Sequence, residues 1–157
     1  MALIRLCWVG ETRDSAFRLA EDDYLARLGR LHPCRREVVR EASKRDVRAR
    51  TACLRKEADG VLRRIGDKDW VMLLDPGGIS LRTEELAELV GRRLQSGGCD
   101  LVLVGPGPWG VTDQIRHRAD FLLSLSRLTF PHELARVIVL EQLYRALTIL
   151  QGHPYHK

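Results

Sequence analysis

The fold is decided by residues 70–78, Trp-Val-Met-Leu-Leu-Asp-Pro-Gly-Gly, an apolar run that stops at a turn signal. A strand that is apolar at every position suits the interior of a parallel sheet, because both of its faces are covered. Residues 101–104 (LVLV) show the same pattern and run into residues 105–110 (GPGPWG). These runs predict two interior strands, each followed by a loop rich in glycine and proline.

On either side of these strands, apolar runs alternate with segments of helical periodicity. Asp14 or Ser15 can cap the first helix, Thr112 can cap a short helix, and Pro131 suits the start of the last helix. This alternation predicts an α/β fold with a mainly parallel sheet and helices on both faces. The other expected strands are 2–9, 34–39 and 121–125, and the expected helices are 15–29, 46–65, 83–96, 112–117 and 131–151.

Length and composition restrict the class of protein. The 157 residues suffice for one domain with a buried core, so residues 1–157 are assigned to a single domain. Hydrophobic residues make up 45% and charged residues 30%, and no apolar run is long enough to cross a bilayer. The cysteines lack the Cys-x-x-Cys spacing of a zinc or redox site. We therefore expect a cytoplasmic protein with no membrane partner and no metal.

Positive charge is concentrated in residues 27–64 of a chain whose net charge is +5. A cluster of this kind can hold nucleic-acid phosphates. Acidic residues interleave with the basic ones, so a solvated helix face is an equally open interpretation. The basic members include Arg35, Arg36, Arg40, Lys44, Arg45, Arg48, Arg50, Arg55 and Lys56.

The loops that leave the two most apolar strands are the first places to look for a ligand site. In open α/β sheets, ligands bind beyond the carboxyl ends of the strands. Residues 75–78 and 105–110 therefore become candidates. The second loop lacks the Lys-Ser/Thr ending of a P-loop and the Gly-x-Gly-x-x-Gly spacing. A tight turn after the strand is its simpler interpretation.

The last expected helix carries an apolar band that is too broad for one buried face of a small monomer, which suggests a subunit interface. Glu141 and Arg145 are spaced to pair along it, and an interior ion pair is at least as good an interpretation as catalysis. Residues 153–157 (His-Pro-Tyr-His-Lys) then combine imidazole, phenol and ammonium groups. Terminal side chains are usually inert, so residue pattern alone assigns them no role.

Residues 125–157, LSRLTFPHELARVIVLEQLYRALTILQGHPYHK, closely resemble the C-terminal signature of the RlmH family of SPOUT-class methyltransferases. Residues 73–88 (LLDPGGISLRTEELAE) and the N-terminal strand followed by residues 21–30 (EDDYLARLGR) resemble further parts of that family, so the likeness spans essentially the whole chain. The resemblance implies a SPOUT-type domain that methylates N3 of a pseudouridine in large-subunit ribosomal RNA.

The resemblance also implies a C-terminal trefoil knot, an exception to the rule that chains avoid knots. S-adenosyl-L-methionine (SAM) would lie in that knot, with apolar walls from Leu74, Leu128 and Phe130. By position, the cofactor-binding residues would be Leu74, Gly107, Ser126, Arg127, Leu128, Thr129, Phe130 and Pro131.

In this family the C-terminus of the partner subunit completes the substrate site, which implies a homodimer acting on 23S rRNA within the 70S ribosome. Tyr155 and His156 would be the catalytic residues, with His156 assisting loss of the N3 proton because imidazole accepts a proton near neutral pH. Lys157 would contact a phosphate. Further candidates, for RNA binding or for support of the dimer, are Arg136, Tyr144 and Arg145.

One departure from the family concerns the loop after residues 101–104. The family usually has Ile-Gly-Gly-x-x-Gly there, whereas this chain has Gly-Pro-Gly-Pro-Trp-Gly at residues 105–110. Proline removes a backbone donor that could contact the cofactor. Two alternatives therefore stay open: a non-catalytic RNA- or ribosome-binding relative, and a SPOUT methyltransferase that acts on another RNA.

Overall fold

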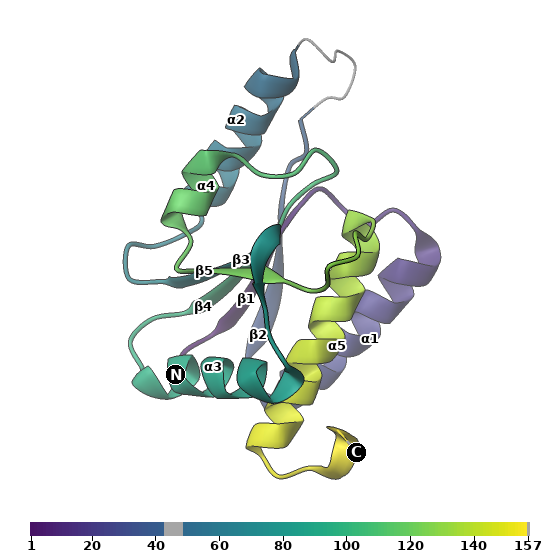
Figure 1. Ribbon diagram of the computed structural model, residues 1–157, viewed down its shortest axis with the longest axis vertical. Coiled ribbons are helices and arrows are strands. Elements are labelled where there is room, and N and C mark those ends of the chain that lie inside the picture. The colour runs from purple at the N-terminus through teal and green to yellow at the C-terminus, as the bar shows by residue number, and fades with distance from the viewer. Residues whose placement is uncertain (43–48, 157) are drawn as a thin grey trace.

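A five-stranded parallel sheet with the order β2-β1-β4-β3-β5 forms the centre of the structure (Figure 1). The structure is a computed structural model that describes residues 1–42 and 49–156. The expected α/β class and the parallel sheet are confirmed. The strands are β1 (Ile4–Val9), β2 (Cys34–Val39), β3 (Trp70–Ser80), β4 (Leu101–Gly105) and β5 (Phe121–Ser124).

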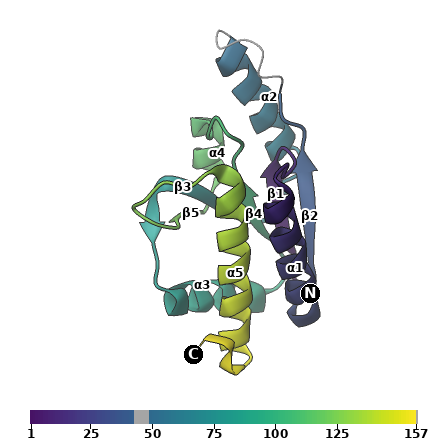
Figure 2. The same ribbon diagram turned by 90° about the vertical axis from the view of Figure 1, so that its right-hand side faces the viewer.

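Helices cover both faces of this sheet (Figure 2). One face packs against α1 (Ser15–Leu31), α3 (Thr83–Ser96) and α5 (His132–Leu150), and the other against α2 (Arg50–Leu62) and α4 (Asp113–Arg118). Alternate residues of each interior strand point to opposite faces, so every side chain of such a strand enters one of two cores. The uniform apolarity of residues 70–74 and 101–104 is explained in this way.

Two helix ends differ from expectation. Helix α1 continues past Gly29 to Leu31, and the backbone amide of His32 donates to the Leu28 carbonyl at 2.9 Å. Glycine ends a helix mainly by adopting positive φ, and Gly29 does not adopt it. Helix α2 ends at Leu62 rather than at Ile65. The expected start at residues 46–48 lies outside the described residues.

Strand β3 does not stop at the Asp-Pro-Gly-Gly turn, as expected, but resumes after it. Leu123 of β5 is paired with Leu74 before the interruption and with Ile79 after it, so residues between them bulge out of the ladder. A Cβ on Gly78 would lie 2.5 Å from the Leu122 carbonyl oxygen. The expected turn is therefore a bulge. Because residue 78 lies against the backbone of β5, only glycine fits at that position.

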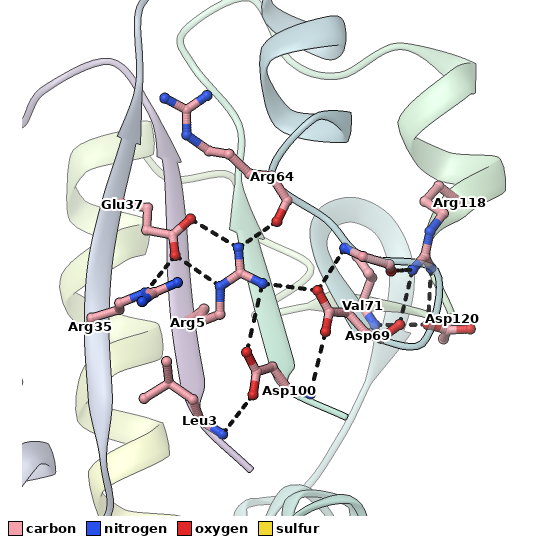
Figure 3. Close-up of polar contacts among 11 residues, drawn as sticks. Leu3, Arg5, Arg35, Glu37, Arg64, Asp69, Val71, Asp100, Arg118 and Asp120 are labelled. Carbon is pink, nitrogen blue, oxygen red and sulfur yellow. Dashed lines mark hydrogen bonds and ion pairs between the residues drawn. The ribbon is translucent and has the colours of Figure 1, made fainter. Parts of the chain in front are cut away.

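The amino-terminal edge of the sheet is fastened by Arg5, which is buried in β1 (Figure 3). Its guanidinium binds Glu37 of β2 through two hydrogen bonds, at 2.8 and 3.1 Å, and binds the Asp69 carboxylate at 2.9 Å. Asp69 precedes β3 and accepts the Gly66 amide, while Asp100 precedes β4 and accepts the Leu3 amide. One cation of β1 therefore binds a carboxylate within β2 and the carboxylates that precede β3 and β4.

Helix α5 lies between α1 and α3, as Figure 2 shows. Its buried apolar residues Val139, Leu140, Leu143 and Leu147 all join the core on that face of the sheet. Two intrachain partners thus account for much of the broad apolar band, and the subunit interface stays a prediction, as does the trefoil knot. None of the helices in the described residues is long and apolar enough to span a bilayer.

The bulge in β3 yields a prediction about stability. Gly78→Ala forces a methyl group against the backbone of β5, so we expect it to lower the free energy of unfolding by about 1–3 kcal/mol. Gly77→Ala is the matched control, because its Cβ would meet only the Asp75 carboxylate, at an ordinary 3.5 Å. Chemical denaturation of both variants provides the measurement. Equal stability of the two variants would contradict the bulge geometry.

Candidate cofactor pocket and C-terminal aromatic cluster

A pocket of about 310 Å³ opens at the bulge of β3 and at the ends of β4 and β5. This is the edge of a parallel sheet at which connecting loops converge, and the volume falls within the range of about 300–1,000 Å³ usual for small-molecule sites. Its walls come from the two loops identified in the sequence and from the segment between β5 and α5. The lining residues are Leu74, Asp75, Pro76, Gly105, Pro106, Gly107, Pro108, Gly110, Leu123, Ser124, Leu125, Ser126, Leu128, Phe130, Pro131, His132 and Ala135.

Most residues expected to surround a cofactor share this pocket. Arg127 and Thr129 are the exceptions: they belong to the same loop but not to the lining. Sequence reasoning missed the first turn of α5, where His132 and Ala135 face the pocket. The start of that helix was expected, but only its packing on the sheet shows which side of the turn faces the cavity. The expected residues that line the pocket are Leu74, Gly107, Ser126, Leu128, Phe130 and Pro131.

The loop of residues 105–110 packs against the carboxyl end of β1. A Cβ on Gly105 would lie 2.5 Å from the Trp8 ring, and one on Gly107 would lie 3.2 Å from Val9. The Gly110 amide donates to the Gly107 carbonyl at 3.2 Å, which closes a turn. The sequence left a tight turn and a ligand site as alternatives for this loop, and the structure shows a tight turn that also forms a wall of the pocket. The prolines of the loop line the cavity without filling it.

An exposed leucine lies on the opposite wall. Leu128 is 73% exposed although its side chain lines the pocket. Its backbone amide donates to Ser126 Oγ at 3.0 Å, and Ser124 Oγ donates to the Ser126 carbonyl at 3.0 Å. An apolar surface held in this way at a cavity mouth suits contact with a flat organic ligand.

Asp75 is the carboxylate of the pocket wall, and it is only 7% exposed. Arg116 of α4 donates from Nε to its Oδ2 at 2.7 Å, and the Gly77 amide donates to its Oδ1 at 2.9 Å. Burial raises the pKa of the Asp75 carboxyl, but these donors outweigh burial, so the pKa lies below its ordinary value. The pocket therefore contains a carboxylate that stays ionised at neutral pH.

Aromatic and basic side chains gather at the other end of α5. The Tyr155 ring meets the Tyr144 ring edge-on at 4.7 Å between centroids, and the Arg145 guanidinium lies 5.1 Å from the Tyr155 centroid. Arg145 also binds Glu141 at 2.6 Å, so the expected ion pair along the helix is present. The hydrogen bond with Tyr24 raises the pKa of Tyr155, which therefore stays protonated at neutral pH.

These two sites stand at opposite ends of one helix. The 19 residues of α5 span about 28 Å at the α-helical rise of 1.5 Å per residue. Figure 1 shows the C-terminus beyond the far end of α5 from the β5 loop. His156 belongs to the 3₁₀ turn Pro154–His156, while its side chain and Lys157 lie outside the described residues. A chain's own Tyr155 is thus remote from its own pocket.

Arg136 was expected to bind RNA, but this expectation is wrong, because the buried side chain cannot contact RNA. The residue is 0% exposed, and burial lowers its pKa. Its Nη1 donates to the Gly10 carbonyl at 3.0 Å and to Thr12 Oγ1 at 3.1 Å, and its Nη2 donates to the Val9 carbonyl at 2.7 Å. Arg136 therefore ties α5 to the carboxyl end of β1, which supports the 105–110 loop.

A parallel sheet in which the bulge of β3 and the loops after β4 and β5 form a largely apolar pocket defines an α/β protein that binds an organic ligand at the carboxyl edge of its strands. The family follows from comparison with known proteins. The family model described as "Predicted SPOUT methyltransferase" matches residues 2–156, and the chain belongs to this family.

Curated relatives agree with that assignment, and a solved structure supports the fold. Ribosomal RNA large subunit methyltransferase H of Caldicellulosiruptor saccharolyticus is 37% identical over 155 residues, which cover 99% of this chain and 100% of that protein. The protein of the same name from Gloeobacter violaceus is 42% identical over 153 residues, covering 98% and 97%. A probable methylase family protein from Haemophilus influenzae Rd KW20 has a TM-score of 0.59 at 13% identity, covering 98% of this chain and 70% of that chain, which supports the fold.

The Asp75–Arg116 pair predicts a specific titration. Because the pKa of Asp75 is lower in the folded chain than its unfolded value of about 3.9, its stabilising effect is complete above that value and is lost as pH falls through the folded pKa. Arg116→Gln removes the donor, so we expect the pKa of Asp75 to rise. Carbon-13 NMR titration of the carboxyl groups measures it directly.

Arg118→Gln is the matched control for this titration. Arg118 also lies in α4, but it binds Asp120 and the carbonyls of Gly66 and Asp69 instead of Asp75. We expect the pKa of Asp75 to be unchanged in that variant. An unchanged pKa in Arg116→Gln as well would show that Arg116 does not hold the carboxylate ionised.

Proposed function

We propose that this chain is a SAM-dependent methyltransferase that modifies N3 of a pseudouridine in 23S rRNA, in the cytoplasm and on the assembled 70S ribosome. Family membership and the names of the relatives support methyl transfer to large-subunit rRNA. The observation that carries the proposal is the pocket itself. Residues distant in sequence that were expected to surround SAM come together around one cavity at the carboxyl edge of the sheet.

The chemistry of the pocket fits SAM. Leu74, Leu128 and Phe130 offer apolar surface for the adenine ring, and the non-helical segment 125–131 offers backbone donors and acceptors for its polar edges. The ionised Asp75 favours a ligand with net positive charge, such as SAM. When bound, SAM supplies a methyl group already activated by its sulfonium, so the protein's main task is to align the nucleophile with it.

The acceptor side of the reaction requires a second chain. Because Tyr155 lies at the far end of α5 from its own pocket, the tail residues 155–157 can act at a pocket only if it belongs to a partner. A two-fold homodimer satisfies this requirement symmetrically, since each tail then completes the other chain's site. In this arrangement Tyr144 and Arg145 of the aromatic cluster adjoin the RNA, and Lys157 contacts a phosphate.

Within that shared site, His156 would accept the N3 proton of the target base, and the bound cofactor would supply the methyl group that replaces this proton. An imidazole titrates near neutral pH and is suited to this role. Tyr155 is not suited to it, because its raised pKa keeps the phenol protonated. The phenol instead donates a hydrogen bond to the base or to its backbone.

Removal of the exposed apolar wall tests SAM binding. We expect Leu128→Ser to weaken SAM binding about tenfold, equivalent to about 1.4 kcal/mol of lost apolar contact. Leu19→Ser is the matched control, because Leu19 is 72% exposed on α1 and does not line the pocket. Isothermal titration calorimetry with SAM measures both, and labelled SAM with separated RNAs and 70S ribosomes then identifies the acceptor.

The outcomes of these assays separate the alternatives. Absence of a saturable SAM site in the parent chain would favour a non-catalytic ribosome-binding protein. Label in transfer RNA, or at another rRNA base, would keep methyl transfer but replace the target. Equal SAM affinity in Leu128→Ser and the parent would remove Leu128 from the cofactor site.

The tail yields a separate prediction. We expect His156→Ala to lower the methylation rate by about 10²–10⁴-fold without changing SAM affinity, because the proton acceptor is lost while the pocket stays intact. Methylation by His156→Ala at the parent rate, with unchanged SAM affinity, would show that His156 is not the acceptor. Single-turnover assays on ribosomes measure the rate.

Mixed dimers show whether the site is shared. Ala135→Trp fills the pocket of one chain, whose intact tail can still serve a His156→Ala partner. In a statistical mixture of the two inactive variants, half of the dimers are mixed and each has one working site, so about a quarter of the parental activity should return. Mixtures that stay inactive would contradict a tail supplied by the partner.

A further inference from the structure

A second hollow, of about 800 Å³, lies between β2 and α2. It begins at the carboxyl end of β2, so it shares the edge of the sheet at which the cofactor pocket opens. Its surface is far more polar than that of the cofactor pocket, and the reaction proposed above does not use it. The residues that line it are Val39, Arg40, Glu41, Ala42, Ala49, Ala52, Cys53, Lys56, Gly60, Arg63 and Arg64.

Cations dominate this hollow. Arg40, Lys56 and Arg63 are exposed, and among the described residues none of the three forms an ion pair. Arg64 donates to the carbonyls of Gly60 at 2.9 Å and Val38 at 3.5 Å, which holds its positive charge at the wall without a carboxylate partner.

Three other arginines of the chain show a contrasting arrangement. Arg5, Arg36 and Arg116 are each matched with two or more carboxylates within 4.0 Å. Those arginines stabilise the fold, because carboxylates of the same chain neutralise their charge. The lining of the hollow combines four cations with one carboxylate, that of Glu41, so its net charge is positive and favours an external anion.

A cation–π contact joins the start of α2 to the loop of residues 105–110. The Arg50 guanidinium, at the start of α2, lies 4.5 Å from the centroid of the Trp109 ring. Trp109 belongs to the 105–110 loop, and its neighbours Pro108 and Gly110 line the pocket. Figure 2 shows α2 extending beyond the ends of the central strands, next to the layer that contains α4. An external polymer that lies along α2 therefore reaches the mouth of the cofactor pocket.

We propose that Arg40, Lys56, Arg63 and Arg64 bind backbone phosphates of the substrate RNA that flank the base entering the pocket. The cations lie along a broad hollow that involves β2 and two turns or more of α2, which suits successive phosphates of a polynucleotide better than one small anion. Contacts to the backbone position RNA without reading its sequence. This inference rests on the proposed function and adds the surface that orients the RNA.

The test replaces three cations at once. In Arg40→Gln/Lys56→Gln/Arg63→Gln, we expect the KM for 70S ribosomes to rise at least about tenfold, while kcat and SAM affinity stay unchanged. Each phosphate contact contributes about 0.7–0.9 to the slope of log affinity against log salt, so filter binding to ribosomes without SAM should lose about two to three from that slope. All three side chains are exposed, so the fold should survive.

The control removes the same charge from the opposite edge of the sheet. Arg30, Lys68 and Arg92 are also exposed, and they lie in or after elements that lead into the starts of β2, β3 and β4. We expect Arg30→Gln/Lys68→Gln/Arg92→Gln to bind ribosomes with nearly the parental affinity and salt slope. Equal losses in the two triple variants would reduce the effect to net charge and overturn the assignment.

Two further outcomes keep this inference distinct from the proposed function. If the parent binds ribosomes but transfers no methyl group, loss of binding in the hollow variant alone would still support the phosphate site. If calorimetry shows saturable binding of inorganic phosphate to the parent, and ribosome binding is unchanged in the hollow variant, the hollow is a free-anion site and the RNA assignment is wrong.

Discussion

The parallel pairing of β3 with β4 on one side and β5 on the other is the constraint on which the rest of the structure depends. Parallel strands start at one edge of the sheet and finish at the other, so their outgoing loops meet. The bulge after Leu74 shifts the register between β3 and β5, and Asp75 within this bulge forms part of the pocket wall. Arg5 fastens the other edge through Glu37, Asp69 and Asp100, which leaves the carboxyl edge available for ligands.

Helix α5 links three tasks along its length. Its first turn lines the cofactor pocket, its middle is buried between α1 and α3, and its end carries the aromatic cluster with Tyr155. Arg136 joins the first two tasks, because it holds the β1 end that supports the 105–110 loop. The same rigid length separates a tail from its own pocket, and this is the physical reason why the proposed site needs two chains.

Arginines of this chain either connect parts of the fold or present positive charge to solvent, and the presence of carboxylate partners distinguishes the two. Arg5 is neutralised by three acidic residues and connects strands. Arg63, of the same residue type, faces the α2 hollow without such a partner among the described residues. A basic composition alone does not distinguish these purposes, and only part of the cluster at residues 27–64 contributes to the positive hollow.

Sequence alone determined the order and approximate positions of the strands, the helix caps Asp14 and Thr112, and the loops that line the pocket, because periodicity and turn chemistry act over a few residues. The segment 125–131 was placed at the cofactor by its resemblance to a family, and the structure brings most of it to the cavity. Only the tertiary structure determined which side chains are buried and which strands pair, because a local sequence pattern contains no information on either. Arg136, a candidate for RNA binding in the sequence, is buried and connects α5 to β1 by hydrogen bonds. Strand β3 continues beyond the expected turn because it pairs with β5 there. Both results depend on contacts between residues far apart in the chain, whose geometry exists only once the sheet and helices have packed.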